Sequence, residues 1–159
     1  MHAYHRHLSK QQWESYKKIS LIRDPYSRFL SHCKWLVNRR TLDGSKAYLH
    51  KGVMHVNDDI AEDVLKLHPD GFGYWHIGER YVVDHMIRME HFDADFITVC
   101  NQLGLPAESP PRVNTTKGRK FNVMLSMAME AKWAEQCELE IDFAHRKFGY
   151  PDYKVWFRD

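Results

Sequence analysis

The sequence predicts a helix-rich α/β fold in which a parallel sheet is flanked by helices. Ile19, Leu21 and Ile22 form an apolar, β-favouring run of the type that buried parallel strands use. A helix is expected directly afterwards, because Asp24 can cap a helix and Pro25 fits its first turn. A buried strand that leads straight into a helix is typical of the α/β class.

Local signals predict the other elements. We expect a strand at residues 18–22 and helices at residues 9–17, 25–39, 59–67, 93–102 and 121–148. A second strand is expected within residues 80–89, formed either by residues 81–83 or by residues 86–89, and residues 74–81 are expected to form an aromatic turn packed on the core. We expect Ser9 to cap the first helix, and Asp59 with Glu62 to form a capping box at the helix of residues 59–67. The helices at residues 93–102 and 121–148 are expected to end at Gly104 and Gly149. Residues 38–52 are expected to be a polar connection.

Composition limits the class of protein. A chain of 159 residues, of which 43% are hydrophobic and 28% charged, suits a single globular domain over residues 1–159. The net charge of +2 does not favour nucleic acid as a partner. No apolar run reaches membrane length and no signal-peptide pattern opens the chain, so a membrane partner is not expected. Cys33, Cys100 and Cys137 lack metal-ligand spacing, and we expect buried thiols in a reducing compartment and no metal site.

Arg23 follows the expected first strand and precedes a helix amino terminus. Open α/β sheets bind ligands at the carboxyl ends of their strands, and helix amino termini favour anions. Arg28 and Ser31 lie three residues apart on the expected helix, so both can face the same side. These features together predict a phosphate or sulfate site. The alternatives are an Arg23 paired with Asp24 or another acid, and an Arg28 that forms an ion pair or a cap.

A second group of polar residues lies late in the chain. Asn114, Thr116, Lys117 and Arg119 surround Gly118, and this combination suits a flap that covers a phosphate. The alternative is a solvated basic loop at the start of the last helix.

The segment Arg23-Asp24-Pro25-x-x-Arg28-x-x-Ser31, after its apolar strand, resembles the 3′-phosphate-binding segment of PAPS-dependent sulfotransferases. PAPS is 3′-phosphoadenosine 5′-phosphosulfate, and the likeness is to the carbohydrate group, including heparan- and chondroitin-type enzymes and bacterial relatives. Further segments resemble the family in the same order along the chain, namely residues 13–18, 92–106, 114–117 and 143–150. The resemblance implies a P-loop-NTPase-like sulfotransferase fold.

The resemblance also implies an activity. A sulfuryl group would move from PAPS, a co-substrate, to a hydroxyl of a carbohydrate acceptor, without a metal. Arg23, Ser31 and Arg28 would bind the 3′-phosphate, and the loop with Asn114 would close over the nucleotide. His5 or His7 would be the general base, because the histidine pKa lies near the working pH. The expected compartment is the cytoplasm for a bacterial protein, or the Golgi lumen for a fragment of a eukaryotic enzyme.

One family feature is missing from the sequence. The Pro-Lys-x-Gly-x-Thr loop that holds the 5′-phosphosulfate does not occur, and no glycine precedes Gly44. We therefore expect the C-terminal portion of the family fold, truncated at its amino terminus, as a fragment or a natural short form. Loss of the first strand would expose a sheet edge, which favours a homodimer. The alternative functions are a non-catalytic module that binds an anion or a partner, and a nucleotide-binding kinase relative.

Overall fold

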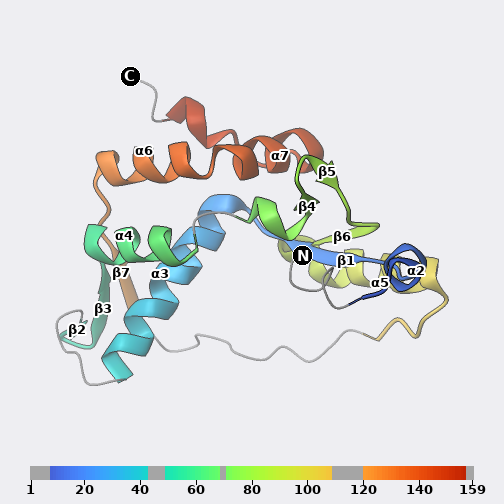
Figure 1. The fold of residues 1–159 in the computed structure, drawn as a ribbon. Helices are drawn as coiled ribbons and strands as arrows, with labels where there is room; N and C mark the ends of the chain where they lie inside the picture. Colours follow the sequence, from blue (N-terminus) through green and yellow to red (C-terminus); the bar gives the residue numbers. More distant parts are fainter. Residues whose placement is uncertain (1–7, 43–48, 69–70, 109–119, 157–159) are drawn as a thin grey trace. The chain divides into compact units, whose positions relative to one another are not determined.

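The computed structural model describes residues 8–42, 49–68, 71–108 and 120–156, and it shows a helix-rich α/β chain with three small sheets. The chain divides into two compact units (Figure 1). Unit 1 comprises residues 1–24 and 71–111, and unit 2 comprises residues 25–70 and 112–159. Each unit has its own strands and helices. The expected α/β class is confirmed at this level.

Unit 1 is built on a parallel pair of strands. β1 (Ile19–Ile22) lies beside β6 (His85–Arg88), with Ile22 opposite Arg88 in the register. The first expected strand is confirmed in position, but its expected burial is wrong: Ile22 is buried, whereas Ile19 and Leu21 are exposed. For the second strand, the pairing selects the alternative at residues 86–89.

Short elements complete unit 1. They are α2 (Lys10–Ser15), η1 (Phe72–Tyr74), the hairpin of β4 (His76–Ile77) and β5 (Arg80–Tyr81), η2 (Met89–His91) and α5 (Phe92–Leu103). The side chains of Ser9 and Gln12 form a capping box at the start of α2. α5 ends at Gly104, whose φ of 67° is left-handed and suits a residue without a Cβ. Both of these helix ends were predicted correctly from the sequence.

Unit 2 consists mainly of helices around a small mixed sheet. Its helices are α3 (Pro25–Leu42), α4 (Asp58–Leu67), α6 (Met127–Gln136), α7 (Glu138–Phe148) and η3 (Tyr153–Trp156). Its strands are β2 (Leu49–His50), β3 (Val53–Val56) and β7 (Lys120–Val123). β3 is the central strand, antiparallel to β2 and parallel to β7. α3 packs against both α4 and β3.

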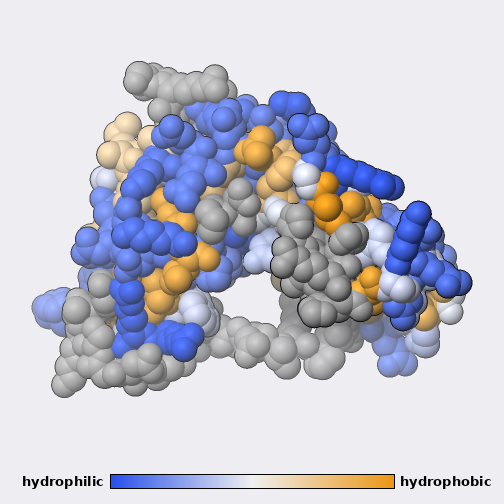
Figure 2. All heavy atoms as spheres, in the orientation of Figure 1, coloured by the Kyte–Doolittle hydropathy of each residue, from blue (hydrophilic) through white to orange (hydrophobic). Residues whose placement is uncertain are grey.

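Aromatic side chains fill the core of unit 2. The Trp133 side chain is fully buried and stacks on Phe29, with 5.6 Å between the ring centroids. Tyr26 and Tyr153 contact the same indole with their ring edges, at 5.1 and 5.4 Å. Such tilted and edge-on pairs stabilise a core beyond the area they bury. Hydrophilic atoms cover much of the visible surface over α4 and α6 (Figure 2).

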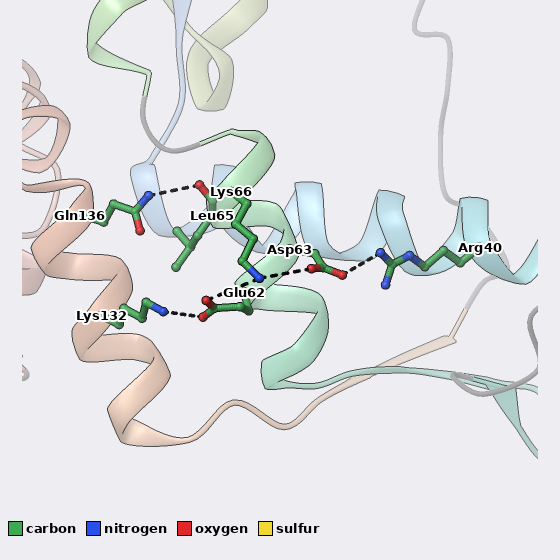
Figure 3. A network of polar contacts seen from close by, with 7 residues as sticks. All are labelled: Arg40, Glu62, Asp63, Leu65, Lys66, Lys132 and Gln136. Carbon is green, nitrogen blue, oxygen red and sulfur yellow. Dashed lines mark hydrogen bonds and ion pairs between the residues drawn. The ribbon is translucent and has the colours of Figure 1, made fainter.

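Charged side chains connect three helices at the surface of unit 2 (Figure 3). Arg40 of α3 donates a hydrogen bond to Asp63 of α4 at 2.7 Å, and Lys132 of α6 pairs with Glu62 of α4 at 2.5 Å. Because these side chains are partly exposed, solvent screens the charges and each pair adds little to the stability of the fold. The network therefore connects α3, α4 and α6 without being a main source of stability.

The structure corrects several expectations about unit 2, and the expected connection at residues 38–52 is one of them, since α3 continues to Leu42 and β2 lies at Leu49–His50. α4 is capped by Asn57, whose side chain accepts a hydrogen bond from the Ile60 N–H at 3.3 Å, so the expected cap by Asp59 and Glu62 is wrong. The single helix expected at residues 121–148 is also wrong. Its first residues form β7, and the remainder divides into α6 and α7 at Cys137.

Candidate functional site

The two parallel strands of unit 1 end side by side, and charged residues follow both of them. Arg23 and Asp24 come directly after β1, and Glu90 comes shortly after β6. In open α/β sheets this edge is where ligands bind. The structure therefore places Arg23 at the carboxyl end of a parallel strand, as the sequence predicted.

Among the described arginines of unit 1, Arg23 combines a half-buried side chain with the lack of an acidic partner. Its side chain is half-buried and forms no ion pair with any described residue of unit 1. Other arginines do have such partners within their units: Arg88 pairs with Asp95, and Arg40 with Asp63. The pairing of Arg23 with Asp24, which was the alternative to a binding role, is not present in the structure. A half-buried guanidinium without a counter-ion favours an anion as ligand.

Two carboxylates accept hydrogen bonds from backbone N–H groups at this edge. Glu90 Oε1 accepts a hydrogen bond from the Asp24 N–H at 3.0 Å. Asp95 Oδ2 accepts one from the Arg88 N–H at 3.0 Å, and the Arg88 guanidinium donates to both oxygens of Asp95 at 2.8 Å. Hydrogen bonds from the Arg88 side chain are the main cause that lowers the pKa of Asp95. The cation of Arg88 is thus engaged, whereas that of Arg23 is available.

A similar clamp lies at the opposite end of the strand pair. Asp84 accepts a hydrogen bond from the Lys18 N–H at 2.8 Å, and the Lys18 ammonium lies 3.1 Å from the same oxygen. The backbone hydrogen bond is the largest cause that lowers the pKa of Asp84. The Lys18 carbonyl in turn accepts from the N–H groups of Asp84 and His85. Both ends of the strand pair are therefore fixed, which holds Arg23 at a defined place.

The aromatic segment at residues 72–81 packs on β1. Trp75 is buried, and its indole N–H donates to the Leu21 carbonyl at 3.1 Å. His76 is also buried and stacks on Phe72 with 3.8 Å between centroids. The expected packed aromatic turn is confirmed. Leu21 itself remains 48% exposed, and the homodimer expected through the sheet edge stays a prediction.

Arg28 and Ser31 lie on α3 in unit 2. The Arg28 guanidinium forms a two-pronged ion pair with Glu140 of α7, with Nε 2.7 Å from Oε1 and Nη2 2.5 Å from Oε2. The Glu140 side chain is fully buried. This is the ion pair that the sequence left as the alternative for Arg28, so its contact with a cofactor stays a prediction. Ser31 is half-buried, and its hydroxyl forms no hydrogen bond with a described residue of unit 2.

The other predicted site residues lie outside the residues that the structure describes. They are the candidate bases His5 and His7 and the loop residues Asn114, Thr116, Lys117 and Arg119. In the described ranges, no group of three or more metal-ligating side chains comes together. No helix in those ranges is both long enough and apolar enough to cross a membrane.

Comparison with family models, with curated proteins and with solved structures finds no match to this chain. The resemblance to sulfotransferases therefore depends on the motifs in the sequence and stays a prediction. The description of the candidate site does not depend on that resemblance, because it uses only the positions and contacts of the residues.

Sequence reasoning missed the acidic residues that organise the site. Asp84, Glu90 and Asp95 each accept a backbone N–H at an end of the strand pair. Their positions offered a partial signal, because Asp84 directly precedes β6 and Glu90 closely follows it. The partners of Asp84 and Glu90 depend on the parallel pairing of strands more than sixty residues apart, which local sequence patterns do not specify.

Proposed function

We propose that this chain is a PAPS-dependent sulfotransferase-like protein in which Arg23 binds the 3′-phosphate of PAPS. The observation that carries the proposal is the half-buried Arg23 side chain, placed at the carboxyl end of a parallel strand without an acidic partner in unit 1. Its planar guanidinium can donate two hydrogen bonds to a phosphate and keeps its charge at any working pH. The sulfotransferase motif in the sequence supplies the identity of the ligand.

In the proposed reaction a sulfuryl group moves from PAPS to a hydroxyl of a carbohydrate. The bond between sulfur and the bridging phosphate oxygen breaks, and a bond from sulfur to the acceptor oxygen forms. 3′-Phosphoadenosine 5′-phosphate (PAP) leaves, and His5 or His7 takes the hydroxyl proton. As in phosphoryl transfer, positioning and stabilisation of charge supply most of the catalysis. The finer fold that we propose is the P-loop-NTPase-like sulfotransferase fold.

We expect Arg23 to supply a large share of the phosphate affinity. The N–H groups of Asp24 and Arg88, which could otherwise donate to a phosphate, already donate to carboxylates. A hydrogen bond to a charged group contributes about 1.5–3 kcal/mol. Removal of the guanidinium should therefore weaken PAP binding about 10- to 100-fold.

The proposal is tested by calorimetric titration of PAP into the wild type and Arg23→Ala. Arg80→Ala is the matched control, because Arg80 is an exposed arginine of the same unit that forms no ion pair with a described residue there. We expect binding in the wild type and in Arg80→Ala, and a loss of about 10-fold or more in Arg23→Ala. Equal losses in both variants would show only a general effect of charge, and no binding to folded wild type would refute the donor site.

A second assay separates an enzyme from a binding module. Transfer of labelled sulfate from PAPS to desulfated heparan and to chondroitin would be measured with the wild type and with Arg23→Ala. We expect transfer to at least one of these glycans and its loss in the variant. Tight PAP binding without transfer to any hydroxyl acceptor would favour the non-catalytic module.

A further inference from the structure

The outward face of α3 carries basic side chains without acidic partners. The helix contains no aspartate or glutamate, and two of its arginines pair with acids of α4 and α7. Lys34 and Arg39 form no ion pair with any described residue of unit 2. Other exposed cations of this unit, Lys66, Lys132 and Arg146, do have acidic neighbours. The described part of unit 2 therefore leaves the charge on this face of α3 uncompensated.

The two unpaired cations lie on the side of α3 that faces away from the core. The buried side chains of the helix form one stripe, which consists of Phe29, Cys33, Leu36 and Val37. Residues four apart are neighbours on a helix, so Lys34 and Asn38 form one row on the other side, and Trp35 and Arg39 form the next row. The four side chains thus occupy one continuous face.

Trp35 and Asn38 add two further features to this face. The Trp35 side chain is 49% exposed, although tryptophan is usually well buried in folded proteins. The Arg39 guanidinium lies over its ring, 5.4 Å from the centroid, and this cation–π contact holds the arginine in place. Asn38 Oδ1 is buried and has no hydrogen-bond partner among the described residues. A buried acceptor without a donor is unfavourable, so a ligand hydroxyl that reaches it gains a hydrogen bond.

We propose that this face, formed by Lys34, Trp35, Asn38 and Arg39, binds an anionic glycan. The two cations bind carboxylate or sulfate groups of the chain, and the indole packs against the apolar side of a sugar ring. A sugar hydroxyl donates to Asn38 Oδ1. The inference rests on the proposed function, since it gives the carbohydrate acceptor a negative charge and names the residues that hold it.

The make-up of the face favours a glycan over other anionic polymers. Nucleic acid carries a phosphate on every nucleotide and is bound by dense basic surfaces, whereas this face has Lys34 and Arg39 alone and the chain has a net charge of +2. The centre of a protein interface is depleted of charged residues, whereas cations flank the large apolar side chain of Trp35 here. Separated charges and polar groups around one aromatic ring suit a sugar chain with spaced acidic groups.

The test measures binding of a desulfated heparan oligosaccharide by calorimetry at low ionic strength. It compares the wild type with Lys34→Gln, Arg39→Gln and Trp35→Ala. Lys51→Gln is the matched control, because Lys51 is an exposed cation of unit 2 that forms no ion pair with a described residue there. We expect a loss of about 3-fold in each cation variant and about 10-fold in Trp35→Ala, but less than about 2-fold in the control.

Two further variants keep the result independent of folding defects. Trp35→Phe retains an aromatic ring and should recover most of the affinity that Trp35→Ala loses. The double variant Lys34→Gln with Arg39→Gln changes only surface charge and should weaken glycan binding about 10-fold. An affinity that is unchanged in the double variant, or a loss of the same size in Lys51→Gln, would overturn the inference.

Other ligands show whether the face recognises more than charge. A neutral glucan oligosaccharide of the same length should bind at least about 10-fold more weakly than the heparan oligosaccharide, because it cannot pair with the cations. Single-stranded oligothymidylate and oligoglutamate should also bind more weakly. Equal or tighter binding of either of these polymers, lost in the same variants, would overturn the assignment to a glycan.

Failure of the inference and failure of the proposed function give different results. If the wild type binds PAP and not the glycan, the donor site stands and the inference is overturned. If the glycan binds as described and PAP does not, the α3 face stands and the sulfotransferase assignment is overturned. If neither binds to a wild type that unfolds cooperatively in urea, both ideas are overturned.

Discussion

Removal of the Arg28 guanidinium should severely destabilise the fold, because it leaves the Glu140 carboxylate buried without its cation. The Glu140 side chain is fully buried, and that of Arg28 is 16% exposed. Their two contacts, at 2.7 and 2.5 Å, join α3 to α7. A substitution of Arg28 by alanine therefore tests the most buried charged contact in the described part of unit 2.

The expected magnitude follows from that burial. Loss of one partner of a buried ion pair costs about 3–5 kcal/mol, mainly through the uncompensated charge that remains. For a chain of this size, that corresponds to a decrease in melting temperature of about 6–20 °C. Replacement of both partners by apolar residues of similar volume, Arg28→Met with Glu140→Leu, should be close to neutral or stabilising.

Urea denaturation of the wild type, Arg28→Ala and the double variant measures these changes. The reasoning is refuted if Arg28→Ala loses less than about 1 kcal/mol, the value typical of an exposed pair. The double variant also tests the function of Arg28. If Arg28 only stabilises the fold, the double variant should bind PAP as the wild type does, and a loss of about 10-fold or more would assign the guanidinium to the nucleotide.

Three further predictions concern single groups. The folded-state pKa of Asp84 lies below its ordinary value, so its hydrogen bonds with Lys18 stabilise the fold above about pH 4 and are lost as the pH falls further. Asp84→Asn should therefore reduce the loss of stability at acidic pH, measured by urea denaturation at a series of pH values. An unchanged loss of stability at acidic pH would contradict this prediction. Asn57→Ala should lower the free energy of unfolding by about 1 kcal/mol, whereas Asp59→Ala should change it by less than about 0.5 kcal/mol, and the reverse order would refute the assignment of the cap. Burial raises the pKa of the Cys33 thiol to about 12, so an aromatic disulfide reagent should modify it only in the unfolded protein, and modification at the same rate in the native protein would contradict the buried position.

The elements that the sequence predicted well are those that carry their own signals. Ser9 begins α2, Pro25 begins α3, and Gly104 ends α5, each through a local property of the residue. The long helix at residues 121–148 failed because β7 forms through pairing with β3, which lies more than sixty residues away. Tertiary pairing of this kind overrides helix propensity.

Only part of the candidate site could likewise be predicted from the sequence. The position of Arg23 followed from the strand and helix on either side of it in the sequence. Its freedom from an acidic partner did not follow, because Asp24 is its direct neighbour and Glu90 reaches the Asp24 N–H only through the β1–β6 pair. The engagement of Arg28 by Glu140 likewise depends on the packing of α3 and α7.

The central claim is that Arg23 binds the 3′-phosphate of the donor nucleotide. The most direct test measures the affinities of PAP and of 5′-AMP, which lacks that phosphate, for the wild type and for Arg23→Ala. We expect the wild type to prefer PAP by about 10-fold or more, and the preference to disappear in the variant because both ligands then lack the contact. A preference of the same size in both proteins would contradict the account, since the 3′-phosphate would then be bound elsewhere.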